Sequence, residues 1–161
     1  MVILNLLPIC CYHDFTTLSK EVLLWKLLTT LGIKQRLITK TKSIIALPVS
    51  AAIKQPYGVV HGGINGVLAE TAASLGANAN LDADRVAVGV NLTVQHLQAV
   101  TQGELIATAT PLHIGHHLQT WQVAITVADQ LTSQATVTLT TMKNNRWFSK
   151  KTYAVKKFVV R

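Results

Sequence analysis

The chain has 161 residues, enough for one ordinary domain with a sizeable hydrophobic core. Apolar residues make up 49% of the sequence and charged residues only 14%, so we expect part of the surface to be covered in an oligomer. No apolar run reaches the roughly 20 residues that a membrane-spanning helix needs, which excludes such a helix.

The net charge of +8 is concentrated at one end of the chain. Residues 143–161 hold seven of the fifteen basic residues and no acidic residue, whereas the remainder is nearly neutral. A basic tail with aromatic residues can touch RNA or anionic lipid, but we prefer the interpretation of a solvated tail without a specific partner. We therefore predict no nucleic-acid or membrane contact.

The first 14 residues are interpreted as an N-terminal extension. They are largely apolar, but they lack the basic start and the small-residue cleavage site of a signal peptide. Cys10 and Cys11 are the only cysteines, and because adjacent cysteines rarely bridge each other, no disulfide framework is expected. A reducing, cytoplasmic location fits this cysteine usage best.

The first regular elements are predicted between residues 17 and 49. Apolar residues recur at helical spacing over 17–31, and Gly32 is expected to end this helix. Residues 33–38 and 43–49 have the composition of strands, and the polar residues between them indicate a hairpin turn.

The main helix is predicted over 64–81, after a loop over 50–57. It is rich in glycine and alanine, which let other backbones approach closely, so we expect it to be buried against a sheet. Segments rich in Val, Ile, Leu and Thr then follow, and we predict strands over 86–97, 104–113, 118–128 and 133–142. Their connections are short enough for an antiparallel meander.

This order of elements predicts an α+β fold in which one antiparallel sheet curls around one long central helix. We assign residues 15–142 to this domain and residues 143–161 to a basic C-terminal tail.

Glu70 is the only acidic residue between positions 22 and 81, and it lies in the middle of the long helix among alanines. Burying a lone carboxylate is costly unless it is paired or protonated, and no lysine or arginine lies within a helical turn. An unpaired, partly buried carboxylate is a candidate functional group. The alternative is that Glu70 faces solvent or accepts backbone hydrogen bonds. Ser74 lies on the same helical face and could orient the carboxylate or its water.

The residues His61, Gly62 and Gly63 are expected to open the long helix. Free N–H groups at a helix start carry partial positive charge, and glycines permit close approach of a ligand. The turn is therefore a candidate oxyanion hole, and the amide of Gln55 could polarise a carbonyl or position water. For His61 we prefer the interpretation that it shapes the turn over that of a general base.

Gly62 and Glu70 are eight residues apart, which corresponds to about 12 Å along a helix axis. One chain cannot place both groups on the same carbonyl carbon. A site that uses both therefore needs two subunits.

The six histidines do not form a recognisable metal-binding pattern. His116 and His117 lie together in a turn that lacks an obvious third ligand, so we predict no metal. The sequence also contains no Gly-x-Ser-x-Gly elbow, no P-loop and no dinucleotide-binding fingerprint.

Several stretches of the sequence together form a recognisable pattern. They are Gln55 to Gly63, Leu68 to Glu70, Ser74, Val88 to Asn91, His96, Pro111 to Gly115, Trp121-Gln122 and Leu139 to Thr141. The pattern covers about residues 15–142 and resembles the hotdog-fold acyl-CoA thioesterases. The most similar branch includes 4-hydroxybenzoyl-CoA thioesterase and 1,4-dihydroxy-2-naphthoyl-CoA hydrolase, and Glu rather than Asp at position 70 favours this aroyl-CoA branch.

The resemblance implies a hotdog fold that hydrolyses an acyl-CoA without a metal or cofactor. Gly62 would donate the N–H that polarises the thioester carbonyl, and Gln55 would assist there. Glu70 of the partner subunit would act as nucleophile or as general base for water, and Ser74 would hold the water or the leaving group. The family is commonly a dimer of dimers, so we expect a homodimer that assembles into a homotetramer.

The resemblance also indicates where CoA would bind. Close relatives often have a basic residue two positions after His96, where this chain has Gln98. The His116-His117 turn replaces one that tends to carry Ser or Arg. The candidate residues for substrate and CoA binding are Gly63, Arg85, His96, His116 and His117.

Two alternative functions remain. One is a thioesterase that edits acyl groups on a carrier protein, and kcat/KM on CoA and on phosphopantetheinyl-protein thioesters would separate it from an acyl-CoA thioesterase. The other is a non-catalytic acyl-CoA-binding module, against which the complete set of Gln55, Gly62, Glu70 and Ser74 argues.

Overall fold

The computed structural model describes residues 26–144. Of the helix predicted over 17–31, the part from Lys26 lies in this range. The N-terminal extension, the cysteines and the tail after Asn144 lie outside it. No helix within residues 26–144 is long and apolar enough to cross a membrane.

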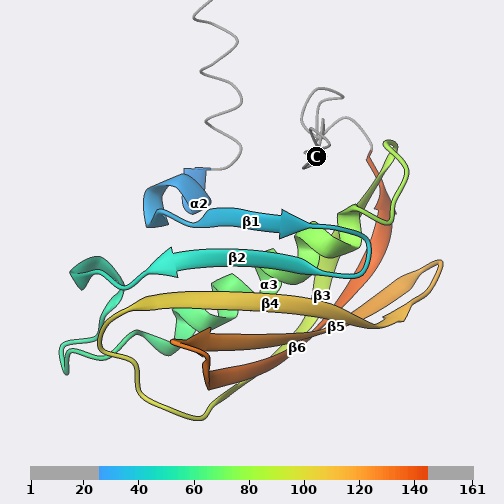
Figure 1. The fold of residues 1–161 in the computed structure, drawn as a ribbon. Helices are drawn as coiled ribbons and strands as arrows, with labels where there is room; N and C mark the ends of the chain where they lie inside the picture. Colours follow the sequence, from blue (N-terminus) through green and yellow to red (C-terminus); the bar gives the residue numbers. More distant parts are fainter. Residues whose placement is uncertain (1–25, 145–161) are drawn as a thin grey trace, which may run out of the picture.

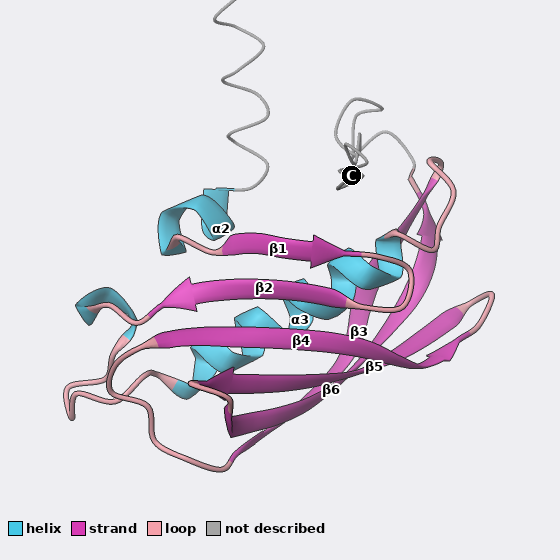
Figure 2. Ribbon diagram, in the orientation of Figure 1, coloured by secondary structure: helices cyan, strands magenta, loops and turns pink. Residues whose placement is uncertain are grey.

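The described chain folds into a six-stranded antiparallel sheet and one long helix (Figures 1 and 2). In chain order the elements are α2 (Lys26–Leu31), β1 (Lys34–Ile38), β2 (Ser43–Pro48), a 3-10 turn (Ala51–Ile53), α3 (Gly62–Asn78), β3 (Arg85–His96), β4 (Glu104–Ile114), β5 (Leu118–Val127) and β6 (Gln130–Lys143). The predicted α+β architecture is confirmed, with the sheet curling around α3.

Local sequence explains several of the element boundaries. Gly32 ends α2 with a φ of +77°, a conformation that glycine adopts without steric cost, as predicted. Ala128 and Asp129 both have positive φ, as the type I′ turn between β5 and β6 requires. The long helix begins two residues before the predicted residue 64 and ends three before the predicted residue 81, because His61 already caps it.

The sheet order is β1-β2-β4-β5-β6-β3, which corrects the predicted meander. Strands β4, β5 and β6 are sequential neighbours, but β3 pairs with β6 at the edge of the sheet and not with β4. Residues 97–103 therefore pass the ends of β6 and β5 to reach β4, as Figure 1 shows for the connection that follows β3. Seven residues suit this crossing as well as a hairpin loop, so loop length alone could not decide between them.

Helix α3 packs closely on the edge strand β3, and three glycines permit the contact. A Cβ on Gly62 would lie 2.8 Å from His96 Nε2, and one on Gly66 would lie 3.5 Å from Leu92 Cδ2. On the strand side, a Cβ on Gly89 would lie 2.5 Å from the Oε1 of Glu70. The first half of α3 thus runs antiparallel to β3, with its backbone almost touching the strand.

The other half of α3 packs on the sheet through Trp121, which is fully buried. Gly76 lies against the indole ring: a Cβ there would come within 2.6 Å of two ring carbons. The indole N–H donates to the Gln119 side chain, whose own amide donates to the Ala77 carbonyl. The buried polar groups around this aromatic side chain are thereby satisfied.

We expect Gly76→Ala to lower the free energy of unfolding by about 1–2 kcal/mol. The new methyl group would overlap the rigid indole ring, and this cost outweighs the helix propensity gained on replacing glycine by alanine. The measurement is urea denaturation at a fixed protein concentration. Gly66→Ala is the matched control, because its Cβ would make an ordinary contact and should leave stability equal or higher. Equal effects of the two substitutions would contradict this account.

Candidate active site

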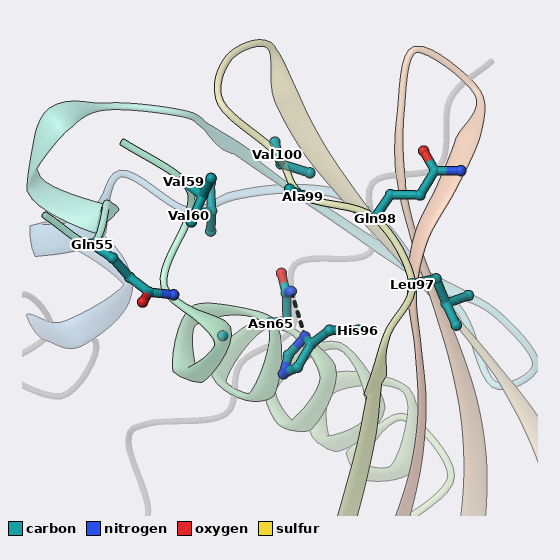
Figure 3. A pocket seen from close by; sticks show the side chains of 10 residues that line it. Gln55, Val59, Val60, Asn65, His96, Leu97, Gln98, Ala99 and Val100 are labelled. Atoms are coloured by element: carbon teal, nitrogen blue, oxygen red, sulfur yellow. Dashed lines mark hydrogen bonds between the residues drawn. The ribbon is translucent and has the colours of Figure 1, made fainter. Parts of the chain in front are cut away.

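A pocket of about 310 Å³ opens where the start of α3 meets the connection after β3 (Figure 3). It is lined by Gln55, Val59, Val60, Gly62, Asn65, His96, Leu97, Gln98, Ala99 and Val100. Three residues predicted for the site, Gln55, Gly62 and His96, therefore lie around one cavity. Most of the other lining side chains are apolar, which suits an organic group rather than an ion.

The loop before α3 holds Gln55 at this pocket. The Gln55 N–H donates to the Val59 carbonyl at 2.7 Å, and Gly58 completes the tight turn with a φ of +82°. The Val60 N–H then donates to the Val100 carbonyl at 2.8 Å, which fastens the loop to the crossing connection. Figure 3 shows the Gln55 side chain directed toward the start of α3.

His61 is the N-cap residue of α3. Its Nδ1 accepts a hydrogen bond from the Gly63 N–H at 2.9 Å, which satisfies one of the free donors at the helix start. This contact supports the interpretation that His61 shapes the turn, and a catalytic role for His61 stays a prediction. The Gly63 N–H is used within the chain, and contact of Gly63 with substrate stays a prediction.

The Gly62 N–H forms no hydrogen bond with any group in the described part of the chain. It is the first residue of α3, where backbone N–H groups have no partner inside the helix and carry the positive end of the helix dipole. A carbonyl oxygen in the pocket could therefore accept a hydrogen bond from it, as the sequence predicted.

Asn65 is a pocket residue that the sequence analysis missed. It is only 7% exposed, and its Nδ2 lies 2.8 Å from Ser133 Oγ and 3.1 Å from His96 Nδ1. Ser133 and His96 are far from Asn65 in the sequence, so only the packing of β3 and β6 on α3 brings the three together. The one sequence feature that could have indicated a role for Asn65 in the site is its position in the first turns of a glycine-rich helix.

Glu70 lies mid-helix as predicted, but its expected partial burial is wrong for the chain considered alone. The core-facing positions of α3 include Leu68, Ala69, Ala72 and Ala73. Glu70 lies on the side of the helix next to the edge strand β3 and is exposed. Its carboxylate lies beside Gly89 on the edge strand.

Glu70 and Ser74 are both absent from the lining of the pocket that contains Gly62. Ser74 is half-buried on the next turn of α3, on the side of the helix that carries Glu70. The structure thus places the predicted catalytic residues in two separate groups within one chain.

Arg85, His116 and His117 gather at the other end of α3. Arg85 Nη1 lies 3.5 Å from His116 Nε2, and the two histidine rings contact each other edge to face with centroids 4.6 Å apart. Arg85 and His116 line a smaller pocket of about 180 Å³. Among residues 26–144, no three His, Cys, Asp or Glu side chains are grouped so that they could hold a metal ion.

Known proteins with similar sequences and folds agree with this arrangement of the chain. A family model described as the thioesterase superfamily matches residues 57–134. Over 97 residues the chain is 38% identical to 1,4-dihydroxy-2-naphthoyl-CoA hydrolase of Listeria monocytogenes, covering 60% of this chain and 79% of that protein.

Solved structures agree with the sequence matches. A thioesterase from Haemophilus influenzae superposes with a TM-score of 0.73 at 29% identity, covering 83% of this chain and 95% of the other. A thioesterase from Staphylococcus aureus has a TM-score of 0.70 at 28% identity, with 72% and 98% covered. The fold is thus that of the hotdog thioesterases. The chain belongs to the thioesterase superfamily, and its reaction class is thioester hydrolysis.

We expect His61→Ala to lower the free energy of unfolding by about 1 kcal/mol, because the Gly63 N–H loses its acceptor. His61→Asn is the control: its side-chain oxygen can accept the same hydrogen bond, so stability should stay close to that of the wild type. Urea denaturation of the three proteins at one concentration provides the comparison. If the Ala and Asn variants are equally stable, the cap contributes nothing.

Proposed function

We propose that this protein hydrolyses an acyl-CoA thioester, with an aroyl group as the acyl part, to the free acid and CoA. The observation that carries the proposal is the Gly62 N–H at the start of α3, which has no partner among residues 26–144. Gly62 lines a mainly apolar pocket together with Gln55 and His96. Donors held in such a place stabilise the negative charge that forms on a thioester oxygen when the carbonyl is attacked.

The carboxylate that drives the attack is Glu70 of a second copy of the chain. Along α3, Glu70 and Gly62 are about 12 Å apart, too far for both to act on one carbonyl. Glu70 projects over β3, at the edge of the sheet, where a second subunit can approach it. A two-fold axis at this edge would place the Glu70 of each chain toward the pocket of the other.

The two edges of the sheet differ in a way that supports this dimer. Strand β1 has five residues and carries Lys34 and Arg36, features that discourage edge pairing. Strand β3 has twelve residues, and no charged residue follows Arg85 at its start. Val90 is 56% exposed there, and Val88 and Leu92 are exposed as well. A long, uncharged edge with exposed apolar side chains favours pairing with a second copy.

In the hydrolysis, a water oxygen forms the new bond to the thioester carbon while Glu70 accepts the proton of that water. The carbonyl oxygen becomes negative and is held by the Gly62 N–H and the Gln55 amide. When the C–S bond breaks, CoA leaves as the thiol after receiving a proton, and the acid is released. Direct attack by the Glu70 carboxylate, followed by hydrolysis of the resulting anhydride, is the alternative route to the same products.

The CoA part of the substrate is assigned to the positive and hydrogen-bonding side chains outside the acyl pocket. Arg85 and His116, with His117 beside them, offer donors suited to phosphate oxygens. Gln98 offers an uncharged amide at the rim of the acyl pocket. Assembly of the dimer into a tetramer and a cytoplasmic location remain predictions from the sequence.

Two features of relatives support the proposal. The Listeria relative is named for hydrolysis of an aroyl-CoA, 1,4-dihydroxy-2-naphthoyl-CoA. Structures of the Staphylococcus aureus thioesterase were solved with a Gln→Ala and with a Glu→Ala substitution, and the two substituted positions are fifteen residues apart. Gln55 and Glu70 have the same separation in this chain.

We expect Glu70→Gln to lower kcat for benzoyl-CoA hydrolysis by about 1,000-fold or more, because the amide can neither accept the proton of water nor attack the thioester. Release of free thiol measures the rate. Glu104→Gln is the matched control, since Glu104 forms an exposed ion pair with Arg36 at the far side of the sheet and should keep its activity.

Wild-type turnover by the Glu70→Gln protein would overturn the assignment. The same acyl group attached to a phosphopantetheinylated carrier protein is assayed in parallel. A higher kcat/KM for the acyl-carrier thioester than for the acyl-CoA would identify the carrier protein, not CoA, as the group that bears the acyl chain. The role of Glu70 would be unchanged. Binding of acyl-CoA without any hydrolysis by the wild type would reassign the protein as a binding module.

A further inference from the structure

The contacts of Asn65 determine which nitrogen of His96 carries a proton. Asn65 Nδ2 has two hydrogens: one is donated to Ser133 Oγ at 2.8 Å, and the other points to His96 Nδ1 at 3.1 Å (Figure 3). The Oγ of Ser133 is also 3.5 Å from His96 Nδ1 and retains its own hydrogen as a donor. Because an amide nitrogen can only donate, His96 Nδ1 is the acceptor in its contact with Asn65.

The orientation of the Asn65 amide follows from the same contacts. Its Oδ1 is buried and has no hydrogen-bond partner in the described part of the chain. In the structure Nδ2, not Oδ1, is the atom that faces both Ser133 Oγ and His96 Nδ1.

An acceptor at Nδ1 places the proton of the neutral imidazole on Nε2. The Nε2 atom lies 2.8 Å from the point where a Gly62 side chain would begin. The Nε2–H therefore lies close to the backbone of Gly62, and both residues line the same pocket. Two residues from different elements, one from α3 and one from β3, thus bring a donor to the lining of one pocket.

We propose that His96 donates its Nε2–H to the thioester oxygen together with Gly62, and that Asn65 is the positioning residue that holds His96 in this tautomer. The proposal rests on the proposed function, because it takes the pocket as the place of the thioester carbonyl.

The tautomer is measured first in the unaltered protein without substrate, from the ¹⁵N chemical shifts of the His96 ring. The expected result is a neutral ring protonated at Nε2. A ring protonated at Nδ1 overturns the proposal. This result is independent of the substrate, so it distinguishes a failure of the proposal from a failure of the proposed function, which the Glu70→Gln variant tests.

Asn65→Asp provides the second test. The aspartate carboxylate has the shape of the amide but can only accept, so it should draw the proton to Nδ1 and remove the donor from the carbonyl site. We expect kcat for benzoyl-CoA to fall by about 100-fold, the usual effect of losing one oxyanion donor. In a His96→Ala background the same substitution should cause no further loss, because the two residues act through one hydrogen bond.

Thr132→Val is the matched control. It removes the buried hydrogen bond from Thr132 to the Ile125 carbonyl, next to Ser133, without touching the imidazole ring. It should reduce stability but keep the Nε2 tautomer and the wild-type kcat. The proposal is overturned if Asn65→Asp retains the wild-type kcat, if its effects add to those of His96→Ala, or if Thr132→Val changes kcat as much.

Discussion

The close contact between helix α3 and the edge strand β3 determines the rest of the site. It depends on glycines at both surfaces, with Gly62 against His96 and Gly89 against Glu70. Side chains at these positions would push the helix away from the strand. Because the contact holds, the helix start meets the end of β3 and forms a pocket there, while the next turns present a carboxylate over the free edge of the sheet.

This single contact gives each chain two incomplete parts of a site. The first part contains the Gly62 N–H, Gln55 and the Asn65–His96 pair, and it can stabilise a negative oxygen. The second part contains Glu70, which can activate water or attack directly. Since the two parts share one helix, their separation is fixed by helix geometry. Only association of two chains can bring complementary parts together, so the proposed dimer belongs to the chemistry itself.

Much of this arrangement could be predicted from the sequence. The residues of the helix start and Glu70 follow from local motifs, and the strands follow from composition. Loop length alone could not predict that residues 97–103 cross to β4 instead of forming a hairpin. The burial of Glu70 was predicted from its apolar neighbours, but burial depends on which side of the helix faces the middle of the sheet. Glu70 lies next to the edge strand instead, where it is exposed.

Asn65 could not be found from sequence because its role depends on tertiary contacts. His96 and Ser133 come from two strands that meet only because β3 pairs with β6. A short motif search includes the glycines of the helix start but not a partner 68 residues further along the chain. Polar residues that act by orienting others therefore become visible only with the hydrogen bonds of the fold.

The two-subunit site is tested most directly by mixing two inactive chains. Glu70→Gln and Gly62→Ala proteins, each with a different affinity tag, are co-expressed, and the heterodimer is purified through both tags. Gly62→Ala keeps the backbone N–H, but its Cβ would overlap His96 Nε2 and disturb the first part of the site. The account expects about half of the wild-type activity per heterodimer, because one of the two symmetry-related sites combines the intact Gly62 of one chain with the intact Glu70 of the other. A stable heterodimer as inactive as either parent would show that each site lies within one chain and would contradict the account.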